Sequence, residues 1–395
     1  MKDFIFSYPT KVYFGKGACK KALDTELKNV GQNIMLAYGG GSIKKNGIYD
    51  EIMTLLSLAN KKVVEFSGIM SNPTYKKVQE GAKIAKENNV DFILAVGGGS
   101  VIDCCKVVAA QAVTDEDIWT MIFEKKTLPS NMLKMGAVVT ASGTGAEMNA
   151  GAVITNEEKK IKAGIFAAHA DFAVLDPYYT LSVPFKQVVS GAFDTLSHCM
   201  ETYFGTPSET FISDEINEAV MRNIIYNIRQ LIKNHDDIDA RSELMWDSAM
   251  AENSILKLGK LTDFQAHQIE HQLGAYTDCN HGQGLAVIHP ILYSHIYSEN
   301  IDKFARFAKA VWNVNDDMPN VEIAVKGINK LTEFIKEIAL PTTFREMGIN
   351  STACFRDVAN STNITAGCCK KLTADEIYEI LMECYYNIII WEVKK

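Results

Sequence analysis

Several common signatures are missing from this sequence of 395 residues. No two of its nine cysteines are spaced as C-x-x-C, which removes support for zinc ribbons and thioredoxin-type redox sites. No apolar run approaches the roughly 18 residues of a membrane span. The opening Met1-Lys2-Asp3-Phe4 also lacks the long apolar core of a signal peptide. We therefore expect a cytoplasmic protein with free thiols and no membrane partner.

Basic residues are the minority in this chain. There are 40 Lys and Arg against 48 Asp and Glu, which gives a formal net charge of −8 at pH 7. A net acidic protein gains little from long-range attraction to polyanions, so we expect no nucleic-acid partner. The net negative charge does not exclude a local basic pocket for a phosphate group.

What is present is a change of pattern along the chain. Up to Asp176-Pro177, short apolar runs alternate with helical stretches, which is typical of crossover units and a mainly parallel sheet. After that point the apolar residues follow helical periodicity. We expect an α/β domain over residues 1–182 and an all-α domain over residues 183–395. The expected strands cover residues 33–38, 62–66, 91–96, 135–140 and 172–175.

Two of these strands end in the same glycine-rich sequence. Gly39-Gly40-Gly41-Ser42 follows the first, and Gly97-Gly98-Gly99-Ser100 follows the third. Consecutive glycines let a backbone approach a pyrophosphate, and the next helix presents free N–H groups to it. Neither loop fits G-x-G-x-x-G, and tight turns use glycine for conformation alone. Ser100 and Asp103 also fit a capping box, which is a structural role.

A third segment is rich in small and hydroxyl-bearing residues. It reads Thr140-Ala141-Ser142-Gly143-Thr144-Gly145-Ala146-Glu147 and directly follows an expected strand. It is either a plain loop or part of a ligand site, because open parallel sheets bind ligands at the carboxyl ends of their strands.

The second half carries a group of residues with metal-ligating chemistry. Asp194 and His198 are four apart on an expected helix, as are His267 and His271, so each pair shares a helix face. His281 follows after a short loop. An isolated Asp–His pair is more often solvated, but three histidines within fifteen residues form a credible set for divalent iron or zinc.

A competing motif overlaps this group. His267-x-x-Glu270-His271 fits H-x-x-E-H, in which two histidines bind zinc and the glutamate is the base of a peptidase. This motif explains neither of the two glycine loops. A third hypothesis is a non-catalytic dinucleotide-binding sensor, although a sensor needs no redox metal.

Taken in order, many short segments resemble one known family over nearly the whole chain, the iron-containing (group III) alcohol dehydrogenases, and among them the bacterial butanol dehydrogenases. The matching segments are Pro9-Thr10-Lys11-Val12-Tyr13-Phe14-Gly15, Asn72-Pro73-Thr74, Gly97-Gly98-Gly99-Ser100-Val101-Ile102-Asp103, Ser142-Gly143-Thr144-Gly145-Ala146-Glu147, Asp176-Pro177, Gly191-Ala192-Phe193-Asp194-Thr195-Leu196-Ser197-His198, His267-x-x-x-His271, His281-Gly282 and Leu340-Pro341-Thr342-Thr343.

The resemblance implies a dehydroquinate synthase-like fold, with a dinucleotide-binding first domain and a metal-binding second domain. It implies that a divalent metal, Fe²⁺ or Zn²⁺, is held by Asp194, His198, His267 and His281, and that His271 stands near the nicotinamide and substrate. Both glycine loops and Asp103 would hold the dinucleotide. Further residues expected to line the cofactor are Thr140, Thr144, Asn149, Lys162 and Leu181. A homodimer is implied as well. Ala141 and Ala146 depart from the family's usual hydroxyl residues.

We therefore expect an enzyme that transfers a hydride between NAD(P)(H) and a short- to medium-chain primary alcohol or aldehyde. His271 is the expected proton relay, because imidazole titrates near physiological pH. Many NAD-dependent dehydrogenases place an acid after the first strand to bind the ribose 2′-hydroxyl. Here no acid follows, and Ser42, Lys44 and Lys45 can receive a phosphate. We predict a preference for NADP(H) over NAD(H).

Overall fold

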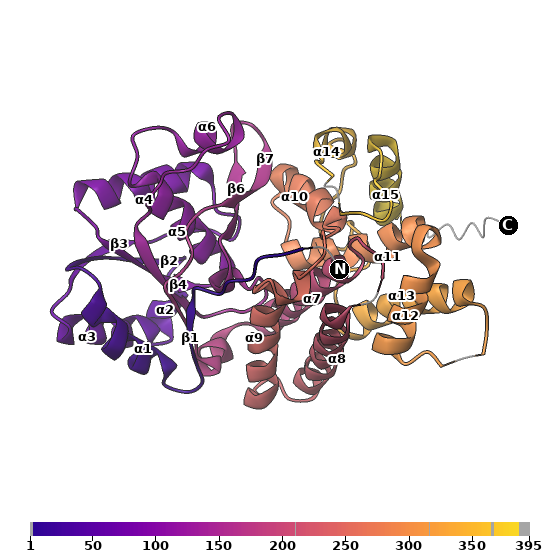
Figure 1. Ribbon diagram of the computed structural model, residues 1–395, viewed down its shortest axis with the longest axis horizontal. Coiled ribbons are helices and arrows are strands. Elements are labelled where there is room, and N and C mark those ends of the chain that lie inside the picture. The colour runs from indigo at the N-terminus through magenta and orange to yellow at the C-terminus, as the bar shows by residue number, and fades with distance from the viewer. Residues whose placement is uncertain (1–2, 210, 316, 365–366, 387–395) are drawn as a thin grey trace. The chain divides into compact units, whose positions relative to one another are not determined.

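The computed structural model describes residues 3–209, 211–315, 317–364 and 367–386 (Figure 1). The chain forms two compact units. The first unit consists of Ser7–Pro184 and Asp236–Asn253, and the second of the described residues of Met1–Phe6, Phe185–His235 and Ser254–Lys395. The chain therefore leaves the first unit at Pro184 and returns to it for one helix, α9 (Ile238–Glu252). Helical periodicity cannot show which core a helix joins, so the sequence did not reveal this return.

A six-stranded parallel sheet forms the centre of the first unit. Its order is β1-β8-β5-β4-β2-β3, and every neighbouring pair is parallel. The strands are β1 (Lys11–Phe14), β2 (Asn33–Tyr38), β3 (Lys62–Phe66), β4 (Phe92–Gly97), β5 (Lys134–Val139) and β8 (Phe172–Leu175). The expected α/β architecture with a parallel sheet is confirmed, and each expected strand lies within one residue of an observed one. The strand β1 was not among the expected strands.

Helices cover both faces of this sheet (Figure 1). Side chains alternate along each strand, so Ile34 and Leu36 of β2 join one core while Met35 and Ala37 join the other. The helices packed on these two cores are α1 (Ala18–Glu26) and α3 (Ile48–Leu58) on the first, and α4 (Tyr75–Glu87) and α5 (Gly99–Gln111) on the second. Burial on both faces explains why these strands read as continuous apolar runs.

The first unit also contains elements that the sequence analysis did not identify. An antiparallel hairpin is formed by β6 (Gly151–Asn156) and β7 (Ile161–Phe166). Two short helices, α2 (Ser42–Lys45) and α6 (Ile118–Phe123), also belong to this unit. The segment α2 is only one helical turn, so the first glycine loop leads into a brief turn, whereas the second leads into the long helix α5.

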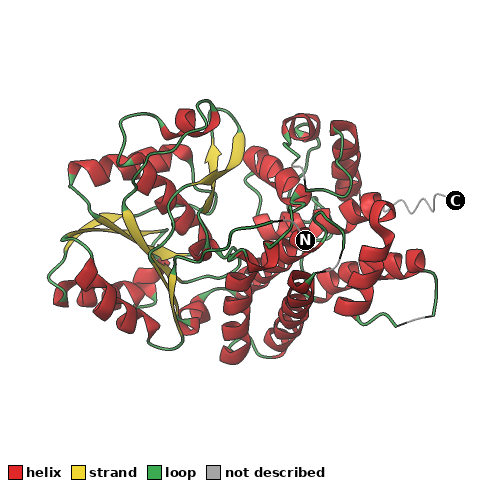
Figure 2. Cartoon of the chain, viewed as in Figure 1, coloured by secondary structure: helices red, strands yellow, loops and turns green. Residues whose placement is uncertain are grey.

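The second unit is helical throughout its described residues, apart from loops and turns (Figure 2). Its helices are α7 (Phe185–Tyr203), α8 (Ile212–Lys233), α10 (Gln265–Thr277), α11 (His281–Ile296), α12 (Ile301–Trp312), α13 (Asn320–Glu337), α14 (Phe355–Ser361) and α15 (Ala374–Tyr386). The expectation of an all-α second part is confirmed. No helix in the described ranges combines the length and the apolarity needed to cross a bilayer.

Candidate metal centre and glycine loops

Helix α7 carries the first two predicted metal ligands on one buried face. Asp194 and His198 are only 4% and 8% exposed, and Oδ1 of Asp194 lies 3.7 Å from Nδ1 of His198. The spacing of four residues produces this proximity, because it corresponds to about one helical turn. The pair is therefore a buried one and not a solvated surface pair.

Two further helices bring histidines to the same carboxylate. α11 packs against both α7 and α10. Nε2 of His267, from α10, lies 3.4 Å from Oδ1 of Asp194. Nε2 of His281, the first residue of α11, lies 3.5 Å from the same oxygen. Three imidazole nitrogens from three helices thus surround one carboxylate oxygen.

These residues fit a divalent metal ion. Two ligands that are each about 2.1 Å from a shared tetrahedral ion lie about 3.4 Å apart, which matches the separations around Asp194. Oδ1 of Asp194 and Nε2 of His267 are buried and make no hydrogen bond, although such groups are normally paired. The ligand atoms of Asp194, His267 and His281 all lie within 4.8 Å of one another. Carboxylate and imidazole suit iron or zinc.

His198 occupies the edge of this group. Its ring stacks on that of His267, with centroids 4.4 Å apart, and it turns Nδ1 and not Nε2 toward Asp194. His198 does not belong to the compact set formed by Asp194, His267 and His281. The structure therefore places all four predicted ligands together, with His198 slightly farther out.

Two buried glutamates contact Nδ1 of His267 and of His281 and orient these rings. Oε2 of Glu201 contacts Nδ1 of His267, and its Oε1 accepts the backbone N–H of Ala266 at 2.6 Å. Oε2 of Glu270 contacts Nδ1 of His281. Both carboxylates are fully buried. A carboxylate bound to Nδ1 leaves Nε2 free to act as a metal ligand, so these contacts favour the tautomer that a metal site requires.

The charges of the site compensate one another. Burial alone would raise the pKa of Asp194, but His198, His267 and His281 hold it well below its usual range. Burial opposes the charged form of His267, yet Glu201 and Asp194 raise the pKa of His267 to about 10. Without an ion, Glu201 and Asp194 therefore hold a proton on His267, which a metal would displace.

The position of Glu270 bears on the H-x-x-E-H motif. In a peptidase of that type both histidines bind the metal and the glutamate activates water. Here Glu270 is buried against His281, and His281 joins His267 beside Asp194. The ring of His271 lies 5.4 Å from that of His281, stacked beside it. The geometry does not support the peptidase hypothesis, and it places His271 next to the metal group.

The second glycine loop in the first unit is shaped by close packing. Gly98 caps α5, and a Cβ atom on Gly99 would lie only 2.2 Å from Oγ1 of Thr144. The backbone N–H of Thr140 donates to the carbonyl of Gly97 at 3.0 Å. The predicted cofactor residues Thr140 and Thr144 therefore lie against this loop.

The capping-box interpretation of Ser100 and Asp103 is wrong. Oγ of Ser100 donates to the carbonyl of Ser71 at 2.5 Å, and no side chain caps the start of α5. Oδ2 of Asp103 instead accepts the backbone N–H of Val153 at 2.8 Å, which ties α5 to the hairpin. A capping box depends on which residue begins the helix, and here α5 begins one residue before Ser100.

The other predicted cofactor residues lie in neighbouring elements of the first unit. Oδ1 of Asn149 accepts a hydrogen bond from the backbone N–H of Gly151 at 2.8 Å and another from Nζ of the buried Lys106 at 3.2 Å. Lys162 is buried in β7. Leu181 lies in the short 3-10 helix η3 (Pro177–Ser182).

The first glycine loop has an acidic neighbour that the sequence analysis missed. Nζ of Lys44 lies 3.1 Å from Oε2 of Glu65, which belongs to the adjacent strand β3. This acid is distant from the loop in the chain and reaches Lys44 because β3 pairs with β2. Glu201 and Glu270 were likewise not expected as partners of histidines, because each contacts a histidine on another helix. The signal for Glu201 was its position seven residues after Asp194, on the same helix face.

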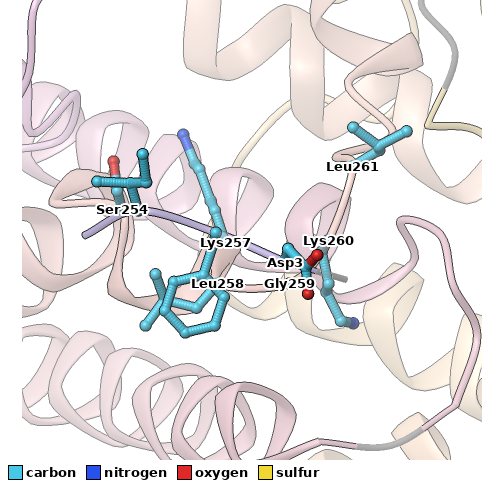
Figure 3. Close-up of a pocket in the computed structure, with 9 residues that line it drawn as sticks. Asp3, Ser254, Lys257, Leu258, Gly259, Lys260 and Leu261 are labelled. Atoms are coloured by element: carbon cyan, nitrogen blue, oxygen red, sulfur yellow. The ribbon is translucent and has the colours of Figure 1, made fainter. Parts of the chain in front are cut away.

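A separate hollow in the second unit carries no comparable chemistry. It is lined by Asp3, Phe4, Ile5, Ser254 and Lys257–Leu261 (Figure 3). Figure 3 shows Lys257 and Lys260 extending to opposite sides of the view. Nζ of Lys260 is buried and bound to Asp214, so this amine belongs to an internal ion pair.

The fold and these residues define a protein with an α/β unit and a candidate centre for a divalent metal, and comparison with known proteins identifies its family. A family model described as "Iron-containing alcohol dehydrogenase" matches residues 9–177, and its C-terminal counterpart matches residues 188–385. The chain belongs to the iron-containing alcohol dehydrogenase family. It is 37% identical to NADH-dependent butanol dehydrogenase A of Clostridium acetobutylicum, over 98% of this chain and 100% of that protein.

Two further similarities extend this result. The chain is 32% identical to the NADPH-dependent aldehyde reductase YqhD of Escherichia coli, over 89% of this chain and 91% of that protein. Its fold matches the crystal structure of NADH-dependent butanol dehydrogenase A from Thermotoga maritima, with a TM-score of 0.92 and 34% identity. That match covers 98% of this chain and 99% of the other.

Proposed function

We propose that this protein is a metal-dependent dehydrogenase that transfers a hydride between NAD(P)(H) and a short- to medium-chain primary alcohol or aldehyde. The observation that carries this function is the convergence of His198, His267 and His281 on one oxygen of Asp194. The named relatives act on butanol or aldehydes. A substrate of this class is therefore the simplest assignment.

The geometry supports a role for each of these residues. Asp194, His198, His267 and His281 would hold the metal, with iron as the leading assignment and zinc as the alternative. A divalent ion supplies Lewis-acid chemistry, which polarises a carbonyl and lowers the pKa of an alcohol. Glu201 and Glu270 orient His267 and His281. The imidazole of His271 takes the proton released by the alcohol and returns it to the product in the reverse direction.

The domain roles follow the positions of these groups. Residues 1–182 would bind the dinucleotide, through the glycine loops at 39–42 and 97–100, Asp103 and the segments containing Thr140, Thr144 and Asn149. Residues 183–395 would bind the metal. Lys162 and Leu181 are further candidates on the coenzyme side. NADP(H) is the proposed preferred coenzyme, because the loop at 39–42 directly after β2 contains no acid, and it includes Ser42 and leads to Lys44 and Lys45.

Assembly and location complete the proposal. We assign a cytoplasmic homodimer that has no nucleic-acid or membrane partner. The apolar residues Phe4, Ile5 and Phe6 are 49%, 98% and 45% exposed. Contiguous exposed apolar surface marks interaction sites, and the interface of a homodimer is the one that we propose here. Sedimentation of the purified protein measures its oligomeric state.

The decisive experiment combines activity with metal content. Purified protein is assayed for aldehyde-dependent oxidation of NADH and of NADPH, after chelation and after addition of Fe²⁺ or Zn²⁺. We expect chelation to abolish the reaction and one metal to restore it. Activity that survives complete metal removal would contradict the proposal. A much higher kcat/KM with NADH than with NADPH would overturn the coenzyme preference alone.

A further inference from the structure

Four side chains from consecutive elements of the first unit form a polar cluster, which we call the Glu65 cluster: Tyr38, Lys44, Tyr49 and Glu65. Tyr38 ends β2, and its hydroxyl donates to Oε2 of Glu65 in β3. Tyr49 donates to Oε1 of the same carboxylate at 2.7 Å. Nζ of Lys44 donates to Oε2 at 3.1 Å and lies 4.4 Å from the centre of the Tyr49 ring. Three donors thus hold one carboxylate in place.

This cluster borders the first glycine loop. Tyr38 directly precedes Gly39, and Lys44 lies two residues after Ser42. Glu65 is in register with Leu36 of β2, close to the carboxyl end of both strands. In open parallel sheets a dinucleotide binds at that edge, and the residues beside the glycine-rich loop distinguish a ribose 2′-hydroxyl from a 2′-phosphate.

The hydrogen bonds of the cluster favour the charged forms of Glu65 and Lys44. The hydroxyls of Tyr38 and Tyr49, together with Lys44, lower the pKa of Glu65 to about 2, so the group is a carboxylate at any physiological pH. Tyr38 and Glu65 raise the pKa of Lys44 above its usual value. The ammonium group of Lys44 is therefore held in an ion pair with the carboxylate of Glu65. A 2′-phosphate, which is an anion, would have to compete with that carboxylate for the lysine and would be repelled by it.

We infer that Glu65 is a coenzyme-selecting residue, which restrains binding of the 2′-phosphate of NADP(H) by engaging Lys44 beside the first glycine loop. This inference rests on the proposed dinucleotide-binding function. The selecting acid comes from the neighbouring strand β3 and not from the loop itself. Glu65 keeps the preference for NADP(H) over NAD(H) smaller than it would be if Lys44 and Lys45 faced the 2′-phosphate without this carboxylate.

The test is direct binding of reduced coenzymes, measured by nicotinamide fluorescence on the metal-loaded protein without substrate. The Glu65→Gln variant keeps the size of the side chain and removes its charge. Lys44 and Glu65 are both more than 40% exposed, so the pair contributes little to stability and the variant should fold. We expect Glu65→Gln to lower the Kd for NADPH by about threefold or more, with less than a twofold change for NADH.

A double-mutant cycle shows whether Lys44 carries the effect. The gain from Glu65→Gln should shrink to less than twofold in a Lys44→Gln background, where only the direct repulsion is removed, and persist in full in a Lys45→Gln background. Glu87→Gln, which removes the same charge from a surface pair with Lys83, should leave the ratio of the two Kd values unchanged. An unchanged ratio in Glu65→Gln, or a gain of the same size with and without Lys44, overturns the inference alone. If the wild-type protein binds neither coenzyme, both the inference and the proposed function fail.

Discussion

Nδ1 of His281 is in contact with Oε2 of Glu270, a fully buried carboxylate that belongs to the neighbouring helix. The opposite nitrogen of the same ring lies 3.5 Å from Asp194. The imidazole is therefore fixed between an orienting carboxylate and a ligand carboxylate. Glu270 is thus assigned as a positioning residue, which is a different role from the water-activating base of an H-x-x-E-H peptidase.

Replacing Glu270 should weaken metal binding without removing a ligand. Carboxylates that hold a metal-bound histidine typically contribute about 10- to 100-fold in metal affinity. We expect Glu270→Leu to show a loss in this range, and Glu270→Gln a smaller one, because the amide oxygen can still accept from Nδ1. Metal affinity is measured by competition with a chelator of known strength, and metal content by elemental analysis.

A matched control is available in the same unit. His295 contacts Glu383 at 3.0 Å, and neither residue belongs to the metal group. Glu383→Leu should leave metal affinity unchanged, whatever it does to stability. Equal losses of metal in the Glu270 and Glu383 variants would contradict the orienting role of Glu270.

His198 and His271 should respond differently to substitution. His198 lies 3.7 Å from Asp194 and is assigned as a ligand, so His198→Ala should lower metal content. His271 is assigned as a proton relay, so His271→Ala should keep its metal and lose about 100-fold in kcat, with a changed pH profile. Metal analysis and steady-state kinetics on the two variants separate the roles. Loss of metal from His271→Ala would make His271 a ligand instead.

Local spacing made part of the metal site predictable. Asp194 and His198 share a helix face because they are four residues apart, and the helix could be inferred from its buried stripe of Phe193, Leu196 and Met200. The glycine loops were predictable for a similar reason, since each directly follows an apolar strand. These features depend only on neighbours in the chain.

Contacts between distant segments could not be predicted in this way. Glu65 reaches Lys44 through the pairing of β2 with β3, and Glu201 reaches His267 because α7 and α10 meet in the second unit. The return of α9 to the first unit is also set by packing. Helical periodicity shows that a face is buried but not what buries it. The resemblance to a family supplied the ligand set, but not these partners.

The buried carboxyl group of Glu147 should make stability depend on pH. Burial is the main cause that raises its pKa to about 7 in the folded protein, against about 4.5 when exposed. The folded state therefore holds a proton that the unfolded state releases between these values. The contribution of this group to the free energy of unfolding is fully present below about pH 4.5 and is lost as the pH rises through 7. We expect Glu147→Gln, which mimics the protonated acid, to unfold at the same temperature as wild type near pH 4.

At pH 8.5 the same variant should be more stable than wild type, by on the order of 2 kcal/mol. Thermal unfolding midpoints at the two pH values measure the difference. Glu157, in the exposed turn between β6 and β7, provides the control, and Glu157→Gln should show no such dependence. A midpoint difference between Glu147→Gln and wild type that is the same at both pH values would contradict the assignment.

The contact between Gly99 and Thr144 should limit substitution in the second glycine loop. A Cβ atom at Gly99 would lie 2.2 Å from Oγ1 and 2.7 Å from Cγ2 of Thr144, so the loop or the threonine must move. Overpacking of this kind costs about 1–3 kcal/mol. We expect Gly99→Ala to lower the unfolding midpoint and to weaken coenzyme binding, because the displaced threonine belongs to the proposed coenzyme site. Gly40 is the matched control, since a Cβ atom there would meet nothing within 4 Å. Gly40→Ala should keep its stability, and Gly99→Ala should recover part of its midpoint when Thr144 is replaced by Gly. If Gly99→Ala unfolds at the wild-type temperature, then the packing of Thr144 does not constrain this loop.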